Sequence, residues 1–387
     1  MNFKKLCYLN CNFSKKIKNK IIKMNNFSLC RIHNYGSNCY LNAGLQILSR
    51  CDKFTKWLNS VDYPKDDFCF FYILKDTINQ ISKSSFFNPL NFINYFTSKN
   101  KNFTINSQNC SQLFIKTVLS NLNEEILNFI LKYNLQENNI INNINNYSPT
   151  NIELDYYKIF LSNNKIFPQS IPYSYFSGIM KIESKGICNK CGEVKKYSFM
   201  DFFEQHIYLD TISSQLTDFE TVLKENLGYS INVKSSCPKC NNKILFEDIS
   251  KIIKLPDILV FKIERYIGET NTIPIKQTEI IDVKDYVESS LNITNTLYEL
   301  FAINIRFGYS TEFGHQICQV KVNNQWFTLN DANNPKVGNV DDYYRNTYGL
   351  FYRKSENQNL RNNSFNNVDN NSNHNKKKKY NKCFCEF

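Results

Sequence analysis

Long hydrophobic runs are missing from this sequence, and acidic residues are missing from its N-terminal part. No apolar run reaches the roughly 18 residues that a membrane-spanning helix needs, so we expect no such helix. Residues 1–30 also lack the uninterrupted apolar core of a secretory signal. The first acidic residue is Asp52, and the chain carries a net charge of +12. Because this excess lies mainly at the two ends, we interpret it as solvated lysine runs, although proteins that bind nucleic acid or anionic lipid carry similar charge.

Histidine is scarce as well, with four residues, whereas cysteine is plentiful, with 14. Without a secretory signal the chain is expected in a reducing compartment, so we interpret the cysteines as thiols or metal ligands rather than disulfides. We predict a cytoplasmic and/or nuclear location. The basic, acid-free residues 1–30 leave an organellar transit segment open.

Composition and periodicity divide the 387 residues into a series of regions. Residues 29–137 have a mainly helical pattern, with Leu41, Leu45 and Leu48 at helical spacing. Residues 168–265 alternate apolar and polar positions, which is typical of β-structure. Further strands are predicted at 298–305, 315–322, 326–329 and 348–352. The polar regions are a basic disordered arm at 1–28, an Asn-rich surface loop at 138–150 and a disordered Asn/Lys-rich tail at 356–387.

Cys39 lies where a polar, glycine-containing loop leads into an apolar-periodic helix. The N-terminus of a helix favours negative charge through its unpaired N–H groups and its dipole, so a cysteine there favours the reactive thiolate form. The amide of Asn34 and the N–H groups of the loop would face the same point, as an oxyanion requires. A lone cysteine is more often a small buried hydrophobe, so this signal needs a partner.

A catalytic cysteine needs a histidine base that a third polar group orients. The four candidates are His33, His206, His315 and His374. Three of them lie in the loop before Cys39, in an apolar strand-like run and in the tail. His315 begins a predicted strand, and the next strand ends before Asn330, whose carbonyl we expect to accept a hydrogen bond from Nδ1–H of the imidazole. The alternative for His315 is a purely structural strand residue.

Two Cys-x-x-Cys pairs stand 45 residues apart in the β-rich region, at Cys188, Cys191, Cys237 and Cys240. Four thiolates form a closed tetrahedral zinc site, which is structural rather than catalytic. We therefore predict a structural Zn²⁺. The alternatives are four unmetallated thiols, a redox pair, or a zinc ribbon that binds nucleic acid.

The segment around Cys39 resembles the cysteine box of the ubiquitin-specific proteases. It matches that box at Asn34, Gly36, Cys39, Tyr40, Asn42, Leu45 and Gln46. Residues 255–266 are similar to the Leu-Pro strand that follows the zinc fingers in this family. Residues 298–331 are similar to its histidine box, and residues 348–354 to its closing Tyr-x-Leu-Phe-Tyr motif. The resemblance implies that Cys39 is the nucleophile, Asn34 part of the oxyanion hole, His315 the base, Asn330 its orienter and Asp331 a helper.

Several positions depart from the family pattern. Asn109 and Gln112 stand where the family has acidic residues, while Gln108 is retained, so a basic substrate tail would lose charge-assisted hydrogen bonds. Arg306 replaces a histidine and Gln316 a tyrosine. We expect both on the loop that borders the substrate tail. With Gly314, these residues are the substrate-binding set that the resemblance implies.

The implied fold is an α+β papain-like cysteine peptidase within residues 29–355. It has a helical thumb at about 29–165, zinc-bearing fingers at about 170–260 and a β-rich palm in the remainder. The implied reaction is thiol-dependent hydrolysis of the peptide or isopeptide bond after the C-terminal glycine of ubiquitin. We expect a monomer that acts on ubiquitin and ubiquitinated proteins, without a nucleic-acid partner. The open alternatives are a peptidase for SUMO or NEDD8, a non-catalytic ubiquitin-binding scaffold, and the nucleic-acid binder above.

Overall fold

A computed structural model describes a large part of the chain. The described residues are 28–104, 107–133, 150, 153–156, 158, 171–209, 216–227, 230–266, 271–291, 293–308, 310 and 313–356. The predicted arm before residue 28, most of the predicted Asn-rich loop and the predicted tail after residue 356 lie outside these ranges. Among the described helices, none is long and apolar enough to cross a membrane.

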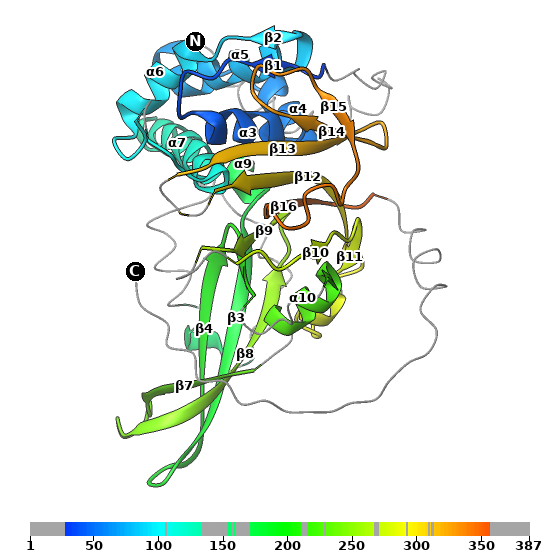
Figure 1. Cartoon of the computed structure of the whole chain (residues 1–387). Coiled ribbons are helices and arrows are strands. Elements are labelled where there is room, and N and C mark those ends of the chain that lie inside the picture. Colours follow the sequence, from blue (N-terminus) through cyan, green and yellow to red (C-terminus); the bar gives the residue numbers. More distant parts are fainter. Residues whose placement is uncertain are drawn as a thin grey trace.

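A helical lobe forms the upper part of the molecule in Figure 1. Its helices are α3 (Cys39–Leu48), α4 (Asp52–Ser60), α5 (Cys69–Lys83), α6 (Leu90–Lys99) and α7 (Ser111–Lys132). A short parallel pair, β1 (Arg31–Ile32) with β2 (Phe86–Phe87), ties the segment before α3 to the segment after α5. The mainly helical pattern predicted for this region is confirmed.

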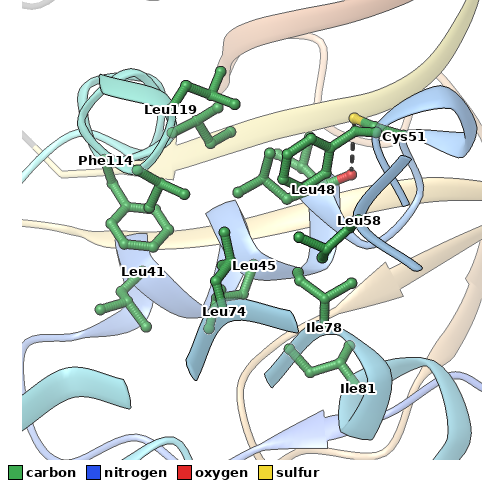
Figure 2. Packing of buried hydrophobic residues seen from close by; sticks show 14 of the residues in the cluster. Leu41, Leu45, Leu48, Cys51, Leu58, Leu74, Ile78, Ile81, Phe114 and Leu119 are labelled. Carbon is green, nitrogen blue, oxygen red and sulfur yellow. Dashed lines mark hydrogen bonds between the residues drawn. The ribbon is translucent and has the colours of Figure 1, made fainter. Parts of the chain in front are cut away.

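Helix α3 lies at the centre of the helical lobe, and all of its residues are buried. Leu41, Leu45 and Leu48 pack among side chains of α5 and α7, as Figure 2 shows. Gly44 allows α7 to approach closely, because a Cβ at this position would lie 2.4 Å from Cδ1 of Phe114. The leucines whose spacing predicted this helix therefore also hold it against α5 and α7.

The central sheet lies below the helical lobe. Its strand order is β15 (Lys336–Gly338), β14 (Gln325–Leu329), β13 (His315–Val322), β12 (Leu297–Phe307), β16 (Thr347–Lys354), β9 (Ile258–Glu264) and β5 (Gln205–Tyr208), and β11 (Ile280–Asp282) also pairs with β12. Neighbours are antiparallel except β5 and β9. The strands predicted between residues 298 and 352 are confirmed, and with the helices they establish the α+β class.

Alternate residues of the central sheet face two different cores. In β9, Val260 belongs to the core shared with the helical lobe, whereas Leu259 and Phe261 belong to a second core. Phe219 from helix α10 (Phe219–Leu227) packs in that second core. This alternation is the period of two that a strand buried on both faces imposes.

The finger sheet, which we define as β4 (Gly192–Phe202), β3 (Gly178–Cys188), β8 (Lys243–Lys254) and β7 (Ile231–Ser236), extends away from the rest of the molecule (Figure 1). All of its pairings are antiparallel. The remaining described elements are η2 (Lys65–Asp67), α9 (Ile171–Ser174), β6 (Thr217–Asp218), β10 (Ile275–Lys276) and η4 (Lys284–Tyr286).

Candidate active site

Three separate elements bring the predicted catalytic residues together. Cys39 is the first residue of α3, His315 is the first residue of β13, and Asn330 directly follows β14. The pairing of β13 with β14, in which Cys318 lies opposite Leu329, places Asn330 beside the start of β13. Residues far apart in the chain thus meet at one edge of the central sheet, under the N-terminus of α3.

The Cys39 side chain is buried, with 1% of its surface exposed. Its Sγ accepts a hydrogen bond from the backbone N–H of Gln316 at 3.3 Å. Oε1 of Gln108 lies 3.8 Å from the same sulfur and can accept the thiol proton. The first bond holds the sulfur against the strand that carries His315.

The imidazole of His315 is oriented by Asn330, as predicted, but through the other ring nitrogen. The distance from Nε2 of His315 to Oδ1 of Asn330 is 2.9 Å. The expectation that Nδ1 would make this contact is wrong. Because an amide oxygen only accepts, Nε2 carries the proton of this hydrogen bond, and Nδ1 is left as the ring nitrogen for the Cys39 side chain.

Electrostatics at this site favour a protonated imidazole. A hydrogen bond with the Cys39 side chain is the main cause that raises the pKa of His315 to about 9, and the hydrogen bond with Asn330 and the charge of Asp331 act in the same direction. Burial opposes this shift, since it disfavours the charged ring. The site can therefore hold an imidazolium next to a cysteine sulfur, which is the arrangement that activates a thiol nucleophile.

Asp331 ties the segment before α3 to the end of β14. Its Oδ2 accepts a hydrogen bond from Nδ2 of Asn34, and its Oδ1 accepts one from Nδ2 of Asn42, each at 2.7 Å. Its carbonyl oxygen accepts the N–H of Ile32 at 2.9 Å. The φ of Asp331 is 48°, in the left-handed region that Asp and Asn tolerate better than most residues. Asp331 therefore links the helical lobe to the residue that follows Asn330.

The amide of Asn34 is held at both ends. Besides the bond from Nδ2 to Asp331, its Oδ1 accepts the N–H of Gly36 at 2.9 Å. The φ of Gly36 is 124°, which a residue with a side chain rarely adopts. The loop thus reaches the N-terminus of α3 in a single conformation, with Oδ1 of Asn38 accepting the N–H of Tyr35 at 2.6 Å.

The predicted substrate-binding residues Gln108, Asn109 and Gln112 have different surroundings. Gln108 lies beside the Cys39 sulfur, as described above. Nδ2 of Asn109 donates to Oγ of Ser107 at 3.1 Å. Gln112 is fully buried in α7, and its Nε2 donates to the carbonyl of Tyr348 at 3.2 Å. Gln112 therefore joins α7 to β16.

Arg306 and Gln316 do not lie on a loop, so that expectation is wrong. Arg306 lies in β12 and Gln316 in β13, where they are cross-strand neighbours, and their exposed fractions are 3% and 1%. The reason is that β12 and β13 stay paired up to Phe307 and His315, so the connecting loop begins only at Gly308. Gly314 lies at the other end of this loop, where a Cβ would come within 2.4 Å of the Phe307 carbonyl oxygen.

Two residues of the site had received no role from sequence reasoning. Ser111, at the start of α7, donates through Oγ to the carbonyl of Tyr40 at 2.8 Å, and its backbone N–H donates to Oε1 of Gln316 at 3.2 Å. Asn42 holds Asp331, as described above. Asn42 was visible as a matched position of the cysteine box, whereas no pattern in the sequence pointed to Ser111.

The four predicted metal ligands lie together at the ends of two hairpins of the finger sheet. The sulfur atoms of Cys188, Cys191, Cys237 and Cys240 all lie within 4.8 Å of one another, and the first and last are 3.5 Å apart. Zinc–sulfur bonds of about 2.3 Å in a tetrahedron require sulfur separations of about 3.8 Å. A set of four thiols at this spacing can hold a metal ion.

Comparisons with known proteins match this chain to ubiquitin carboxyl-terminal hydrolases. A family model described as ubiquitin carboxyl-terminal hydrolase matches residues 30–352. The probable ubiquitin carboxyl-terminal hydrolase 4 of Schizosaccharomyces pombe is 25% identical over 369 residues, which covers 85% of this chain and 59% of that protein. Ubiquitin carboxyl-terminal hydrolase 4 of Arabidopsis thaliana is 24% identical over 322 residues, covering 77% of this chain and 82% of that protein. Ubiquitin carboxyl-terminal hydrolase Usp2 of Drosophila melanogaster is 23% identical over 326 residues, covering 78% and 32%.

Proposed function

This chain belongs to the ubiquitin carboxyl-terminal hydrolase family, and from that membership we propose that it is a thiol-dependent deubiquitinase. It would hydrolyse the peptide or isopeptide bond after the C-terminal glycine of ubiquitin, with ubiquitin and ubiquitinated proteins as its partners. The observation that carries this proposal is the contact of Cys39, His315 and Asn330, which come from three separate elements. A purely structural cysteine and histidine would not require this arrangement.

In the proposed reaction, the thiolate of Cys39 attacks the carbonyl carbon of the terminal glycine. The tetrahedral intermediate collapses to a thioester, and the imidazolium of His315 gives its proton to the departing amine. Neutral His315 then takes a proton from water, which attacks the thioester and releases the free carboxylate and the Cys39 sulfur. Asn330 keeps the ring in place through both steps, since Nε2 stays hydrogen-bonded to its carbonyl.

The amide of Asn34 is our proposed oxyanion donor. One hydrogen of Nδ2 bonds to Asp331, which leaves the second hydrogen for a developing negative charge. The N–H groups at the start of α3 would add to this stabilisation, because they have no partner within the helix. Oε1 of Gln108 lies beside the sulfur, so this amide would act as an acceptor for the Cys39 thiol rather than as an oxyanion donor.

The residues that would meet the substrate tail carry no negative charge at Asn109 and Gln112. We propose that Asn109 contacts the tail through neutral hydrogen bonds, each about half as strong as a charge-assisted bond. The burial of Gln112 and its bond to Tyr348 support a role in fixing α7 rather than in binding substrate. Weaker recognition of a basic tail would follow.

The four-cysteine cluster is proposed to bind a structural Zn²⁺. The donor set of four thiols, its spacing and its place at two hairpin ends support this metal. Gly192 and Asn241 have left-handed backbone, and each directly follows the second cysteine of its pair, so they turn the chain toward the next strand. A closed set of four ligands leaves no position for substrate, so the ion would hold the tip of the finger sheet together.

A ubiquitin probe with an electrophilic C-terminus tests the main proposal. The wild-type chain should form a covalent adduct about 8–9 kDa heavier, and Cys39→Ala should form none. Cys69→Ala removes an exposed cysteine outside the site and serves as the matched control, so it should react as wild type does. A folded wild-type chain that does not react would favour the non-catalytic scaffold.

Preference among modifiers needs a second assay. Turnover of ubiquitin, SUMO and NEDD8 carrying a C-terminal fluorophore should be measured side by side, and ubiquitin should give the highest kcat/KM. Strong turnover of another modifier with none of ubiquitin would replace the proposed substrate while keeping the chemistry.

A further inference from the structure

The Arg306 guanidinium lies beside two tyrosine rings. Its Cζ is 5.1 Å from the ring centroid of Tyr266 and 5.6 Å from that of Tyr348. The two rings themselves meet edge to face, with centroids 5.8 Å apart. A guanidinium suits this position better than an ammonium, because it combines cation–π attraction to the rings with several N–H donors in a fixed plane.

This arrangement also holds the loop that precedes His315. A guanidinium N–H of Arg306 donates to the carbonyl of Ser310 at 3.1 Å, and the hydroxyl of Tyr266 donates to the carbonyl of Gly308 at 3.3 Å. On the other side, the backbone N–H of Arg306 donates to the carbonyl of Asn346 at 2.9 Å. Arg306 is therefore tied to the residue before β16 and, through its guanidinium, to Ser310.

The loop ends of the β12–β13 hairpin are packed tightly. Phe307 and His315 form the last pair of the two strands. A Cβ on Gly308 would lie 2.8 Å from Cα of Gly314, and a Cβ on Gly314 would lie 3.6 Å from Nε of Arg306. The guanidinium thus packs against Gly314, the residue that precedes His315. A displacement of the guanidinium would therefore shift Gly314 and, with it, the His315 imidazole.

We propose that Arg306 is a positioning residue for His315, and that its guanidinium, held beside Tyr266 and Tyr348, keeps Gly314 and the start of β13 in the place where the imidazole reaches Cys39. This inference rests on the proposed function only in naming His315 as the base. It replaces the expectation that Arg306 binds the substrate tail, since a side chain with 3% of its surface exposed has little area to offer a substrate.

Turnover measurements with Arg306→Lys and Arg306→Met test the proposal. Lysine keeps the charge and methionine keeps the apolar stem, but both lose the planar guanidinium. With a ubiquitin–fluorophore substrate, we expect kcat to fall about tenfold in each variant while KM changes less than about twofold, because a small misplacement of a catalytic group mainly slows the chemical step.

Arg353→Lys is the matched control. Arg353 also lies over an aromatic ring, 5.9 Å from the centroid of Phe301, and pairs with Glu299 in the same sheet. It lies near the opposite end of β12 from His315, so its replacement should leave kcat and KM unchanged. Unfolding midpoints of all variants should be recorded to correct the rates for any unfolded fraction.

Alkylation of Cys39 by iodoacetamide gives a readout that needs no ubiquitin. Mass spectrometry of the Cys39 peptide would follow the rate between pH 5 and pH 9. We expect the rate at pH 6 to fall about tenfold in both Arg306 variants, because a displaced imidazolium no longer favours the thiolate. Retained alkylation with a raised KM would make Arg306 a substrate contact, and unchanged kcat and alkylation with a lowered unfolding midpoint would make it purely structural. Either result overturns the proposal.

Tyr266→Leu provides the second test should the Arg306 variants not fold. It removes one of the two neighbouring rings and the bond to Gly308 while keeping the arginine, so it should also slow alkylation at pH 6. An unchanged rate in a folded Tyr266→Leu chain counts against the proposal. If wild type turns over no ubiquitin but its Cys39 is alkylated fast at pH 6 in an Arg306-dependent way, the proposed substrate fails and the positioning role stands.

Discussion

The catalytic junction, by which we mean Cys39, His315, Asn330 and Asp331, and the tip of the finger sheet are held together in different ways. The junction lies between the helical lobe and the central sheet, next to a core of residues from both. The tip of the finger sheet has only a small core of its own, made by Val194, Ile244, Phe246 and the four cysteines. Packing with hydrogen bonds positions the first, whereas strand pairing and a candidate metal site must hold the second.

Because of this difference, a substitution should affect a different property, activity or stability, in each region. In the junction, the large core tolerates the loss of one polar group, but catalysis depends on atoms placed to a fraction of an ångström. At the tip of the finger sheet, few apolar side chains are buried, so losing one cross-link should loosen the whole tip. We therefore expect substitutions in the junction to lower activity with little loss of stability, and substitutions at the tip of the finger sheet to lower stability with little loss of activity at Cys39.

The largest expected effect is on turnover when the base is removed. His315→Ala should lower kcat by about 10³-fold, because no other group at the junction can protonate the leaving amine. The unfolding midpoint should change little, since the large core next to the site stays intact. Steady-state kinetics and calorimetry would measure both, with His206→Ala in β5 as the control. A His315→Ala chain that keeps more than about a tenth of wild-type kcat would disprove the assignment.

Breaking the four-cysteine cluster is expected to lower stability while leaving the reactivity of Cys39 unchanged. Cys188→Ser should remove about one equivalent of zinc and lower the unfolding midpoint by about 5 °C, because serine is a poor zinc ligand. Hydrogen exchange should rise in β3, β4, β7 and β8, while iodoacetamide should still alkylate Cys39 at the wild-type rate. Cys69→Ser is the control, and metal analysis that finds zinc retained in Cys188→Ser would contradict the ligand assignment.

A more moderate effect on kcat is expected when the hydrogen bonds that join Asp331 to the helical lobe are weakened. Asp331→Asn should lower kcat about tenfold, since it weakens the charge-assisted hydrogen bonds to Asn34 and Asn42. Asparagine tolerates the left-handed backbone at this position, so strain is not added. Asp282→Asn changes an aspartate that also accepts two hydrogen bonds, from the N–H of Lys284 and from Thr296, and should leave kcat unchanged. Equal kcat in Asp331→Asn and wild type would show that this link is dispensable.

The smallest expected effect is a pH-dependent difference in stability. The pKa of His315 is raised to about 9 in the folded chain, above its ordinary value of about 6.5 when unfolded. Its contribution to stability is therefore fully present below about pH 6.5 and is lost as pH rises through 9. Cys39→Ala removes the main cause of this shift, so wild type should exceed it in unfolding midpoint by about 1–2 °C at pH 6 and by less at pH 9.5. The difference is small because solvent screens His315, which is only partly buried. A difference that grows with pH would contradict this picture.

Much of the fold was predictable because its signals are local. The spacing of Leu41, Leu45 and Leu48 predicted helix α3, and period-two alternation predicted β12, β13, β14 and β16. The paired Cys-x-x-Cys motifs predicted a four-cysteine cluster, since short turns between strands bring such pairs to hairpin ends. The predicted boundaries of thumb, palm and fingers remain predictions.

The parts that failed depend on the register and burial of paired strands. Arg306 and Gln316 were expected on a loop, yet β12 and β13 continue past them and bury both side chains. The role of Ser111 was missed because its partners, Tyr40 and Gln316, lie in other elements. Neither the end of a strand pair nor a hydrogen bond between distant elements leaves a trace in local composition.

By itself, the sequence determined the α+β class, the candidate nucleophile and base, and the four thiols that gather at the finger tip, because spacing and residue chemistry within short segments are enough for each. Only the tertiary structure decided that Nε2 rather than Nδ1 of His315 meets Asn330, and that Arg306 lies buried beside two tyrosines. The physical reason is that the direction of a side chain follows from how whole elements pack against one another. That packing is set by contacts between residues that lie far apart in the chain.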